Sequence, residues 1–324
     1  MSERKFSKFK GLDSDFLHDL KEGKLHSILK FERKHRKSFM VEIRNNFLSL
    51  YFLGHGIEVK RIKAKYYLIA SNTFNPKSRL PDKLKKIVKS YGTNTWQISF
   101  DDIEKENSHS FNKIMTSIIL KIVEYKKGDI SEGVSEINHF IDNRAVGKNG
   151  ILIIDRQVVY PGSKKGRIDL LGLKRLNNGK FTFVVLELKN KNNTEIANVF
   201  TNQVKRYVDL VYDEYEDFRL TYEEVLKQKI KLGLLKPIKC KIAPKKEISK
   251  RDIEAIVILD NYNIKSDLKD DGLLHRALED WKELRKLSDD YNAKLFLKTN
   301  ILDPTFFMDY QKTDNLLKKY KRNN

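Results

Sequence analysis

The chain has 324 residues, of which 40% are hydrophobic and 33% are charged, a composition that is ample for packed cores and a length that suggests two domains. Its 64 Lys and Arg residues outnumber its 44 Asp and Glu residues by 20, which favours a polyanionic partner, nucleic acid before an anionic membrane. The single cysteine, Cys240, excludes an internal disulfide and a cysteine-based zinc site.

Neither a signal peptide nor a membrane span is apparent in the sequence. The residues after Met1 are charged and lack an apolar core, and the apolar run Ile118–Leu120 is broken by Lys121. We therefore expect a cytoplasmic protein without a membrane partner. Lysine is also the default surface residue in lysine-rich proteomes, so the charge alone does not decide for nucleic acid.

Residues 1–126 are predicted to form an α+β module that contains an antiparallel meander. A capped helix is expected over residues 13–20, and from 25 to 70 the pattern is strand-like, with tight turns at Arg44-Asn45-Asn46 and Gly54-His55-Gly56. Short strands joined by tight turns are typical of a meander. The elements expected next are a basic helix, a strand and a second helix, over residues 80–91, 95–100 and 102–125.

Basic and aromatic residues lie side by side in this module, a pattern that suits contact with phosphates and unstacked bases. The simpler interpretation, which we favour, is that the aromatic residues form the core and the lysines face solvent. The module could bind DNA, a partner protein or a second copy of the chain, and the last case would give a homo-oligomer.

A helix is predicted over residues 129–143, where apolar residues recur with helical spacing. Glu132 and Glu136 are four positions apart and share one of its faces. Ordinary surface glutamates explain the pair equally well.

The loop from Gly162 to Arg167 superficially resembles a phosphate-binding loop, but it lacks the Gly-Lys-Ser/Thr ending and no helix follows, which excludes a nucleoside-triphosphate site. As a basic loop it could contact a phosphate backbone.

The stretch from Arg167 to Tyr207 predicts two strands of a hairpin followed by a helix. Residues 181–189 are β-branched and aromatic and follow an Asn-Gly turn signal, which favours a buried strand. Side chains alternate along a strand, so Glu187 and Lys189 point to the same face. Charges at the end of so apolar a strand are costly unless they are paired, which indicates a cleft that binds a metal and a phosphate.

Asp169 lies on the preceding strand and folds back towards Glu187 across the turn. Two carboxylates so close repel each other unless a cation lies between them. Oxygen ligands of this kind suit Mg²⁺ or Mn²⁺, which would activate water and stabilise charge on a phosphoryl oxygen. Lys189 would orient that water or offset charge in the transition state.

Two further buried strands are predicted near the end of the chain, over residues 253–260 and 293–297, with a helix over 268–287 between them. Strand, helix and strand in this order suggest a parallel crossover at the edge of a sheet.

Asp169 followed by Glu187-Leu188-Lys189 resembles the core of the PD-(D/E)xK nuclease superfamily. Gln203 and Tyr207 resemble the Gln-x-x-x-Tyr element of its RecB-like branch. The residue before Asp169 is Ile168 rather than the proline that names the superfamily, at a position that varies within it. Glu-x-Lys alone is a weak signal in a lysine-rich chain, and the order of the elements carries the resemblance over residues 132–296.

The resemblance implies an α/β protein in which residues 127–324 form a restriction-endonuclease-like mixed sheet flanked by helices. It implies a metal held by Asp169, Glu187, the backbone carbonyl of Leu188 and an acid of the preceding helix, Glu136 or else Glu132. Lys189 would position or activate the attacking water. Gln203 would orient Lys189 or a phosphate, and Tyr207 would support the helix or contact the DNA backbone.

The leading hypothesis is a Mg²⁺-dependent deoxyribonuclease, an endonuclease of restriction, repair or anti-phage defence. One alternative is a nucleic-acid-binding protein whose acidic pair is inert, although an inert copy has no chemical need for Asp, Glu and Lys together. Another is a partner-dependent defence subunit that uses the N-terminal meander as a docking platform. Exonuclease action and an RNA substrate are also compatible with the sequence.

Overall fold

The computed structural model describes residues 8–107, 109–125, 150–163, 166–190, 194–260, 272–298 and 306–308. The chain is a mixed α/β protein that divides into two compact units, and each contains a six-stranded sheet. One unit is built from the described parts of Lys8–Asp142 and Thr221–Ile238, and the other from those of Asn143–Leu220 and Lys239–Asn324. Within the described ranges, no helix is both long and apolar enough to cross a membrane.

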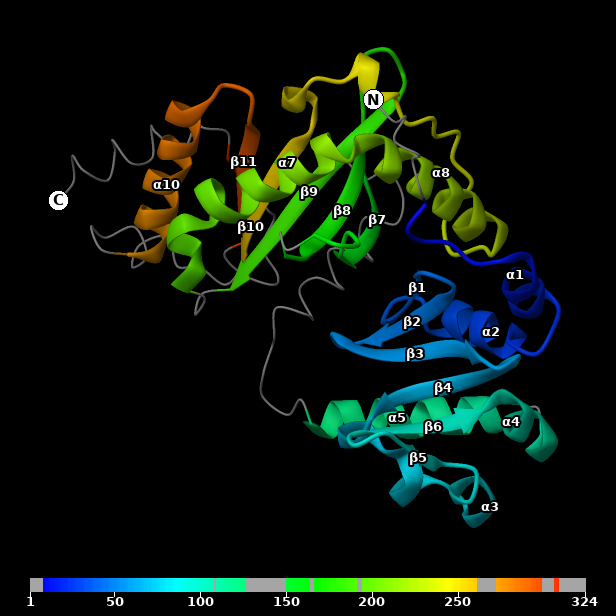
Figure 1. The fold of residues 1–324 in the computed structure, drawn as a ribbon. Helices are drawn as coiled ribbons and strands as arrows, with labels where there is room; N and C mark the ends of the chain where they lie inside the picture. The colour runs from blue at the N-terminus through cyan, green and yellow to red at the C-terminus, as the bar shows by residue number, and fades with distance from the viewer. Residues whose placement is uncertain are drawn as a thin grey trace. The chain divides into compact units, whose positions relative to one another are not determined.

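The N-terminal unit contains an antiparallel sheet with the strand order β1-β2-β3-β4-β6-β5 (Figure 1). Its strands are β1 Phe39–Ile43, β2 Phe47–Phe52, β3 His55–Ile62, β4 Lys65–Ser71, β5 Lys89–Tyr91 and β6 Thr95–Ser99. Each of the first three strands pairs with the next one along the chain, and β4 pairs with β6. The predicted meander is therefore confirmed.

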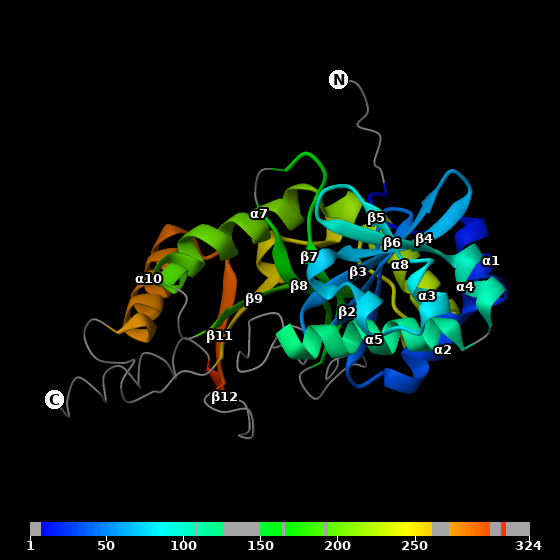
Figure 2. The same ribbon diagram turned by 90° about the horizontal axis from the view of Figure 1, so that it is seen from below.

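Helices of this unit are α1 Ser14–Lys21, α2 His26–His35, α3 Asp82–Lys85, α4 Phe100–Glu106 and α5 Ser110–Tyr125. The predicted helix after Asp13 is confirmed, and the Asp13 side chain caps it by accepting a hydrogen bond from the Phe16 N–H. α2 and α5 lie along one face of the sheet (Figure 2). Phe31 of α2 joins them to it, because its ring contacts Phe39 of β1 and Phe111 of α5.

Three predictions for the N-terminal unit are wrong. The strand-like region expected from residue 25 begins with helix α2, because its buried residues Ile28, Leu29 and Phe31 follow helical spacing. The helix expected over 80–91 shrinks to α3, since residues from Lys89 pair with β6 as strand β5. The helix expected over 102–125 is two helices, α4 and α5, with an interruption at Asn107. The Asn107 side chain accepts hydrogen bonds from the His109 N–H and the Ser110 hydroxyl group at the start of α5.

Helix α8 (Tyr215–Lys231) contributes its C-terminal part to the N-terminal unit. Gln228 donates a hydrogen bond to the Leu12 carbonyl and accepts one from the Leu12 N–H. Lys229 forms a buried ion pair with Glu42 of β1 at 2.6 Å. These contacts place residues 221–238 with the N-terminal unit, whereas the sequence placed them in the domain spanning 127–324.

The C-terminal unit contains a mixed sheet with the strand order β12-β11-β10-β9-β8-β7 (Figure 1). Its strands are β7 Ile151–Val158, β8 Ile168–Arg175, β9 Phe181–Asn190, β10 Glu254–Asp260, β11 Asn292–Lys298 and β12 Phe306–Met308. β7, β8 and β9 are antiparallel neighbours, whereas β10 pairs in parallel with both β9 and β11. The expected hairpin, mixed sheet and parallel β10–β11 pair are confirmed.

Three helical segments follow β9 along the chain, and a fourth lies between β10 and β11. They are a 3₁₀ turn at Thr194–Asn198, a π-helical turn at Val199–Val204, α7 Lys205–Asp213 and α10 Leu273–Leu287. α7 lies across β9 (Figures 1 and 2), and its residues Val208 and Val211 are buried. Phe200 of the π-helical turn stacks on Trp281 of α10 with 5.3 Å between ring centroids. The turn is thereby fixed close to the end of β9.

Candidate active site

Asp169 and Glu187 lie at the same end of the β8–β9 hairpin. Leu170 pairs with Leu186 in the antiparallel register, so Asp169 and Glu187 occupy the next positions outward. The Leu188 N–H donates a hydrogen bond to Asp169 Oδ2 at 3.0 Å. Asp169 is 8% exposed and Glu187 is 3% exposed, and β9, which carries Glu187, lies inside the sheet between β8 and β10. The hairpin therefore brings two carboxyl groups together in a buried setting.

Lys189 lies on the same face of β9 as Glu187. Its Nζ is 2.9 Å from Glu187 Oε1 and 3.3 Å from Glu195 Oε2. Glu195 belongs to the 3₁₀ turn after β9 and is exposed, whereas Lys189 is buried. The lysine thus connects the buried carboxyl pair to a carboxylate at the surface.

Glu195 also contacts the second part of the predicted motif. Gln203 Nε2 donates a hydrogen bond to Glu195 Oε2 at 3.1 Å, so this carboxylate joins Lys189 to Gln203. Gln203 stands on the π-helical turn rather than on the regular helix that the sequence predicted. Glu195 was missed because no spacing rule marks an acid in a short turn. The only signal available was a carboxylate close after Glu-x-Lys.

The electrostatics of the carboxyl pair follow from burial and mutual charge. Burial raises the pKa of Asp169, although the Leu188 N–H and the charge of Lys189 oppose it. Burial and the negative charge of Asp169 raise the pKa of Glu187 well above its ordinary value, while Lys189 opposes them. Holding both carboxyl groups ionised is therefore unfavourable unless more positive charge is added between them.

Tyr207 of α7 packs beside this cluster. It is 3% exposed, and burial and then the charge of Glu187 raise the pKa of its hydroxyl group. Arg206 Nη2 donates to Tyr207 Oη at 3.4 Å. A Cβ atom at Gly166, where φ is +89°, would lie 3.2 Å from Tyr207 Oη, so this loop needs glycine for both space and backbone conformation.

Two arginines add positive charge around the acidic cluster. Burial raises the pKa of Asp169, and the charge of Arg167, at the end of the loop before β8, opposes that rise. The hydrogen bond from Lys189 lowers the pKa of Glu195, and the charge of Arg206 adds to this effect. Arg206 also lies over the Tyr207 ring, with 5.1 Å from Cζ to the centroid. Arg167 thus adds positive charge near Asp169, and Arg206 adds it near Glu195 and Tyr207.

The donor atoms of the cluster fit an oxygen-preferring divalent cation. Glu187 Oε2 is buried and has no hydrogen-bond partner among the described residues. Lys189 offsets part of the negative charge of this pair, but a buried carboxylate oxygen without a donor, beside a second carboxylate, favours a further cation. The described parts of the chain hold no group of three or more His, Cys, Asp or Glu side chains that could bind a metal. Any further ligands would be a backbone carbonyl, water or phosphate, or a residue beyond the described ranges.

Of the residues predicted for the site, the structure brings Asp169, Glu187, Lys189, Gln203 and Tyr207 into one cluster. Leu188 lies between Glu187 and Lys189, with its N–H bonded to Asp169. Glu136 and its alternative Glu132 lie outside the described residues.

Comparison with known proteins gives little beyond this geometry. No protein-family model and no curated protein matches the sequence. Among solved structures, the chain shows 11% identity to SfsA of Pyrococcus furiosus in complex with Ca²⁺, over 83% of this chain and 91% of that one, with a TM-score of 0.17. A similarity at this level does not establish a common fold. The fold and site thus define the chain as an α/β protein with a buried carboxylate–lysine cluster at the end of a hairpin.

Proposed function

We propose that the protein is a metal-dependent nuclease that hydrolyses phosphodiester bonds in DNA, and that its C-terminal unit is related to the RecB-like branch of the PD-(D/E)xK superfamily. The observation that carries the proposal is the contact of Lys189 with Glu187 at 2.9 Å beside the buried Asp169. Buried, interacting ionisable groups of this kind concentrate at functional sites.

Asp169 and Glu187 would hold Mg²⁺ or Mn²⁺, together with the Leu188 carbonyl and an acid from the preceding segment, Glu136 by preference. When bound, such an ion lowers the pKa of its water and stabilises charge on the phosphoryl oxygens. Added positive charge would also keep the two buried carboxyl groups ionised, which their raised pKa values otherwise disfavour.

Lys189 would position the attacking water or offset the negative charge that develops on the phosphate. Its contacts with Glu187 and Glu195 hold the ammonium group in place. Gln203 would act through Glu195, with which it shares a hydrogen bond. Tyr207 would support this arrangement from α7, against which the loop at Gly166 packs.

The net charge of +20 favours a phosphate-bearing substrate. Arg167 and Arg206 place positive charge near the acidic cluster, which favours a phosphate there over a neutral ligand. Together with the carboxyl pair, these groups favour DNA cleavage over binding alone. An endonuclease of restriction, repair or anti-phage defence is the form we propose.

The test is incubation of supercoiled plasmid and linear DNA with the protein in Mg²⁺, Mn²⁺ or EDTA. We expect metal-dependent nicking or linearisation of the plasmid, lost in Glu187→Ala. Glu247→Ala is a matched control, because Glu247 is a surface carboxylate paired with Lys180 at the opposite end of the hairpin. Cleavage by Glu187→Ala at the wild-type rate would refute the proposal. DNA binding without cleavage under any condition would favour the alternative of a non-catalytic or partner-dependent protein.

A further inference from the structure

The sheet of the N-terminal unit has one apolar face and one polar face. Leu48, Val59, Leu68 and Ile98 form a row across β2, β3, β4 and β6 in the strand register, and all four are fully buried. The neighbouring row consists of Phe47, Lys60, Tyr67 and Ser99, and all four are partly exposed. Successive strand positions point to opposite faces, so the second row lies on the face opposite the helices α2 and α5.

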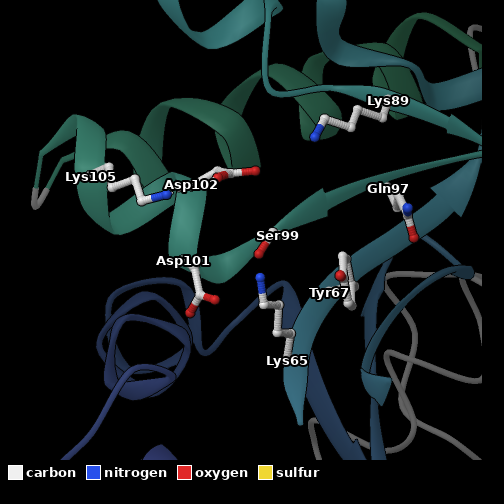
Figure 3. A pocket seen from close by; sticks show the side chains of 8 residues that line it. All are labelled: Lys65, Tyr67, Lys89, Gln97, Ser99, Asp101, Asp102 and Lys105. Carbon is white, nitrogen blue, oxygen red and sulfur yellow. Dashed lines mark ion pairs between the residues drawn. The ribbon is translucent and has the colours of Figure 1, made fainter. Parts of the chain in front are cut away.

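A polar pocket of about 200 Å³ lies on this second face. Strands β4, β5 and β6 and helix α4 bring its residues together, although β5 and β6 are separated from β4 along the chain. Its lining includes Lys65, Tyr67, Lys89, Gln97, Ser99 and Lys105. Figure 3 shows Lys65 and Lys89 extending towards the space beside Ser99.

Two carboxylates also line the pocket, and each has a cation of its own. Asp101 is paired with Lys24 at 2.8 Å, and Asp102 with Lys105 at 3.6 Å. Within the part of the chain that the structure describes, Lys65 and Lys89 form no ion pair with a carboxylate. The charge of Lys65 does help to lower the pKa of Asp101, after the hydrogen bond from Lys24. The three lysines that line the pocket nevertheless outnumber its two carboxylates, which suits a phosphate-bearing ligand.

We propose that this pocket binds a nucleoside phosphate unit of an unpaired nucleic-acid strand. Tyr67 offers an aromatic surface for a base, and the Gln97 amide offers a donor and an acceptor for its edge. Lys65 and Lys89 would hold the adjacent phosphates. At about 200 Å³ the pocket is smaller than the roughly 300–1,000 Å³ of sites for drug-sized ligands, which excludes a duplex and limits the pocket to one unit of a strand at a time.

The order of the residues across the sheet supports this assignment. Lys89 of β5 is paired in register with Gln97 of β6, and Tyr67 of β4 with Ser99 of β6. The aromatic ring, the amide and the lysines are thus fixed by strand pairing on one surface. This site belongs to the N-terminal unit, and its binding does not depend on cleavage by the carboxylate cluster of the other unit.

The experiment measures binding of a fluorescent 12-nucleotide oligo-dT by anisotropy, with the full chain carrying Glu187→Ala and with EDTA present, so that cleavage is absent. Tyr67→Ala should weaken binding about 5- to 150-fold, the range for loss of one base–aromatic stack, whereas Tyr67→Phe should retain it. Lys65→Ala combined with Lys89→Ala should reduce the slope of log affinity against log salt by about 1.4, since each phosphate contact on a single strand contributes about 0.7.

The matched control combines Lys30→Ala and Lys34→Ala, two exposed lysines of α2 on the other side of the sheet. This variant should change affinity less than twofold. An oligonucleotide with 5-bromodeoxyuridine should crosslink under ultraviolet light to the tryptic peptide 66–77, which contains Tyr67. Competition of free dTMP with the oligonucleotide shows whether the pocket binds a free nucleotide or a nucleotide unit of a strand.

The proposal is overturned if Tyr67→Ala and the double lysine variant bind and crosslink like the parent chain, or if the α2 control loses as much affinity as they do. Absence of oligonucleotide binding would overturn it as well. Plasmid cleavage would be unaffected by that result, so failure of this pocket is distinguishable from failure of the nuclease proposal.

Discussion

Lys189 and Glu187 form an ion pair at 2.9 Å in which neither side chain is more than 4% exposed. They are two positions apart on β9, so strand alternation points both to the same side. A buried pair of this kind costs desolvation free energy and is weak support for stability. Its place beside Asp169 is better explained by chemistry than by folding.

Removing one buried carboxylate should abolish metal binding. We expect Mn²⁺ at about 100 times its Kd to stabilise the wild-type protein by about 2.7 kcal/mol and to raise its melting temperature, because the ion binds only the folded state. Glu187→Gln keeps the shape of the side chain but loses its charge, so its melting temperature should not respond. Thermal melts with and without Mn²⁺ measure this. An equal shift in both proteins would place the metal elsewhere.

Loss of the Lys189 ammonium group should reduce DNA cleavage far more than DNA binding. Lys189→Met keeps most of the side chain's length and apolar stem, and we expect a decrease of about 100- to 10,000-fold in the cleavage rate, typical of a lost proton-transfer or water-positioning group. Single-turnover kinetics measure it. Lys180→Ala, which removes a lysine paired with Glu247, is the control and should cleave normally. Wild-type cleavage by Lys189→Met would disprove its role.

Glu195 should act as a positioning residue for Lys189. It accepts a hydrogen bond from Gln203 and pairs with Lys189 from an exposed position. Glu195 is 62% exposed and Lys189 keeps its pair with Glu187, so Glu195→Ala should change the free energy of unfolding by less than about 1 kcal/mol. The cleavage rate should nevertheless fall roughly tenfold, the factor that corresponds to about 1.4 kcal/mol in the barrier.

If Glu195 had only a structural role, its removal would leave the pH profile of cleavage unchanged. If it positions the lysine, removal of its negative charge should shift the alkaline limb of the profile to lower pH, because a carboxylate favours the charged ammonium form. Gln203→Ala should produce a smaller change in the same direction. An unaltered profile in Glu195→Ala would contradict the positioning role.

The stability of the C-terminal unit should depend on pH through Asp209. Burial raises the pKa of Asp209, but hydrogen bonds from Lys205, Lys250 and Tyr291 together outweigh it and leave the pKa below its usual value. A lowered folded-state pKa contributes stability above the unfolded value of about 3.9, and this contribution is lost as pH falls through the lower folded value. Asp209→Asn should therefore destabilise at pH 7 by about 1.5–3 kcal/mol, as for hydrogen bonds to charged groups.

Urea unfolding at a series of pH values checks this prediction. The difference between wild type and Asp209→Asn should shrink steadily below pH 4. Asp82→Asn is the comparison, because Asp82 pairs with Lys85 on an exposed turn and should contribute almost nothing at any pH. A constant difference between pH 7 and pH 3 would exclude Asp209 as the titrating group.

The ion pair of Glu42 with Lys229 should be essential to the N-terminal unit. Both side chains are at most 2% exposed, and they join β1 to the C-terminal part of α8. Lys229→Met removes the ammonium group that lies 2.6 Å from this buried carboxylate, which should cost about 3–5 kcal/mol. Replacing both residues by Leu should recover most of that loss. Thermal or urea unfolding distinguishes the two variants, and equal stability of Lys229→Met and wild type would refute the prediction.

Local patterns predicted the parts of the fold that depend on neighbouring residues. The Asn-Gly turn and the apolar run after it predicted β8 and β9, and strand alternation placed Glu187 beside Lys189. By contrast, β5 was mistaken for a helix. Residues 89–91 form a strand only because β6 supplies hydrogen-bond partners, and propensity carries no information about that pairing.

The sequence by itself determined the meander, the hairpin and the pairing of Asp169 with Glu-x-Lys, because each follows from turns and alternation within a short stretch. Only the tertiary structure decided that Glu195 joins Lys189 to Gln203, and that Thr221–Ile238 packs with the N-terminal unit. It also decided that strands β4, β5 and β6 and helix α4 line a polar pocket. The physical reason is that each of these contacts depends on how helices and strands pack and pair in three dimensions, which no local periodicity specifies.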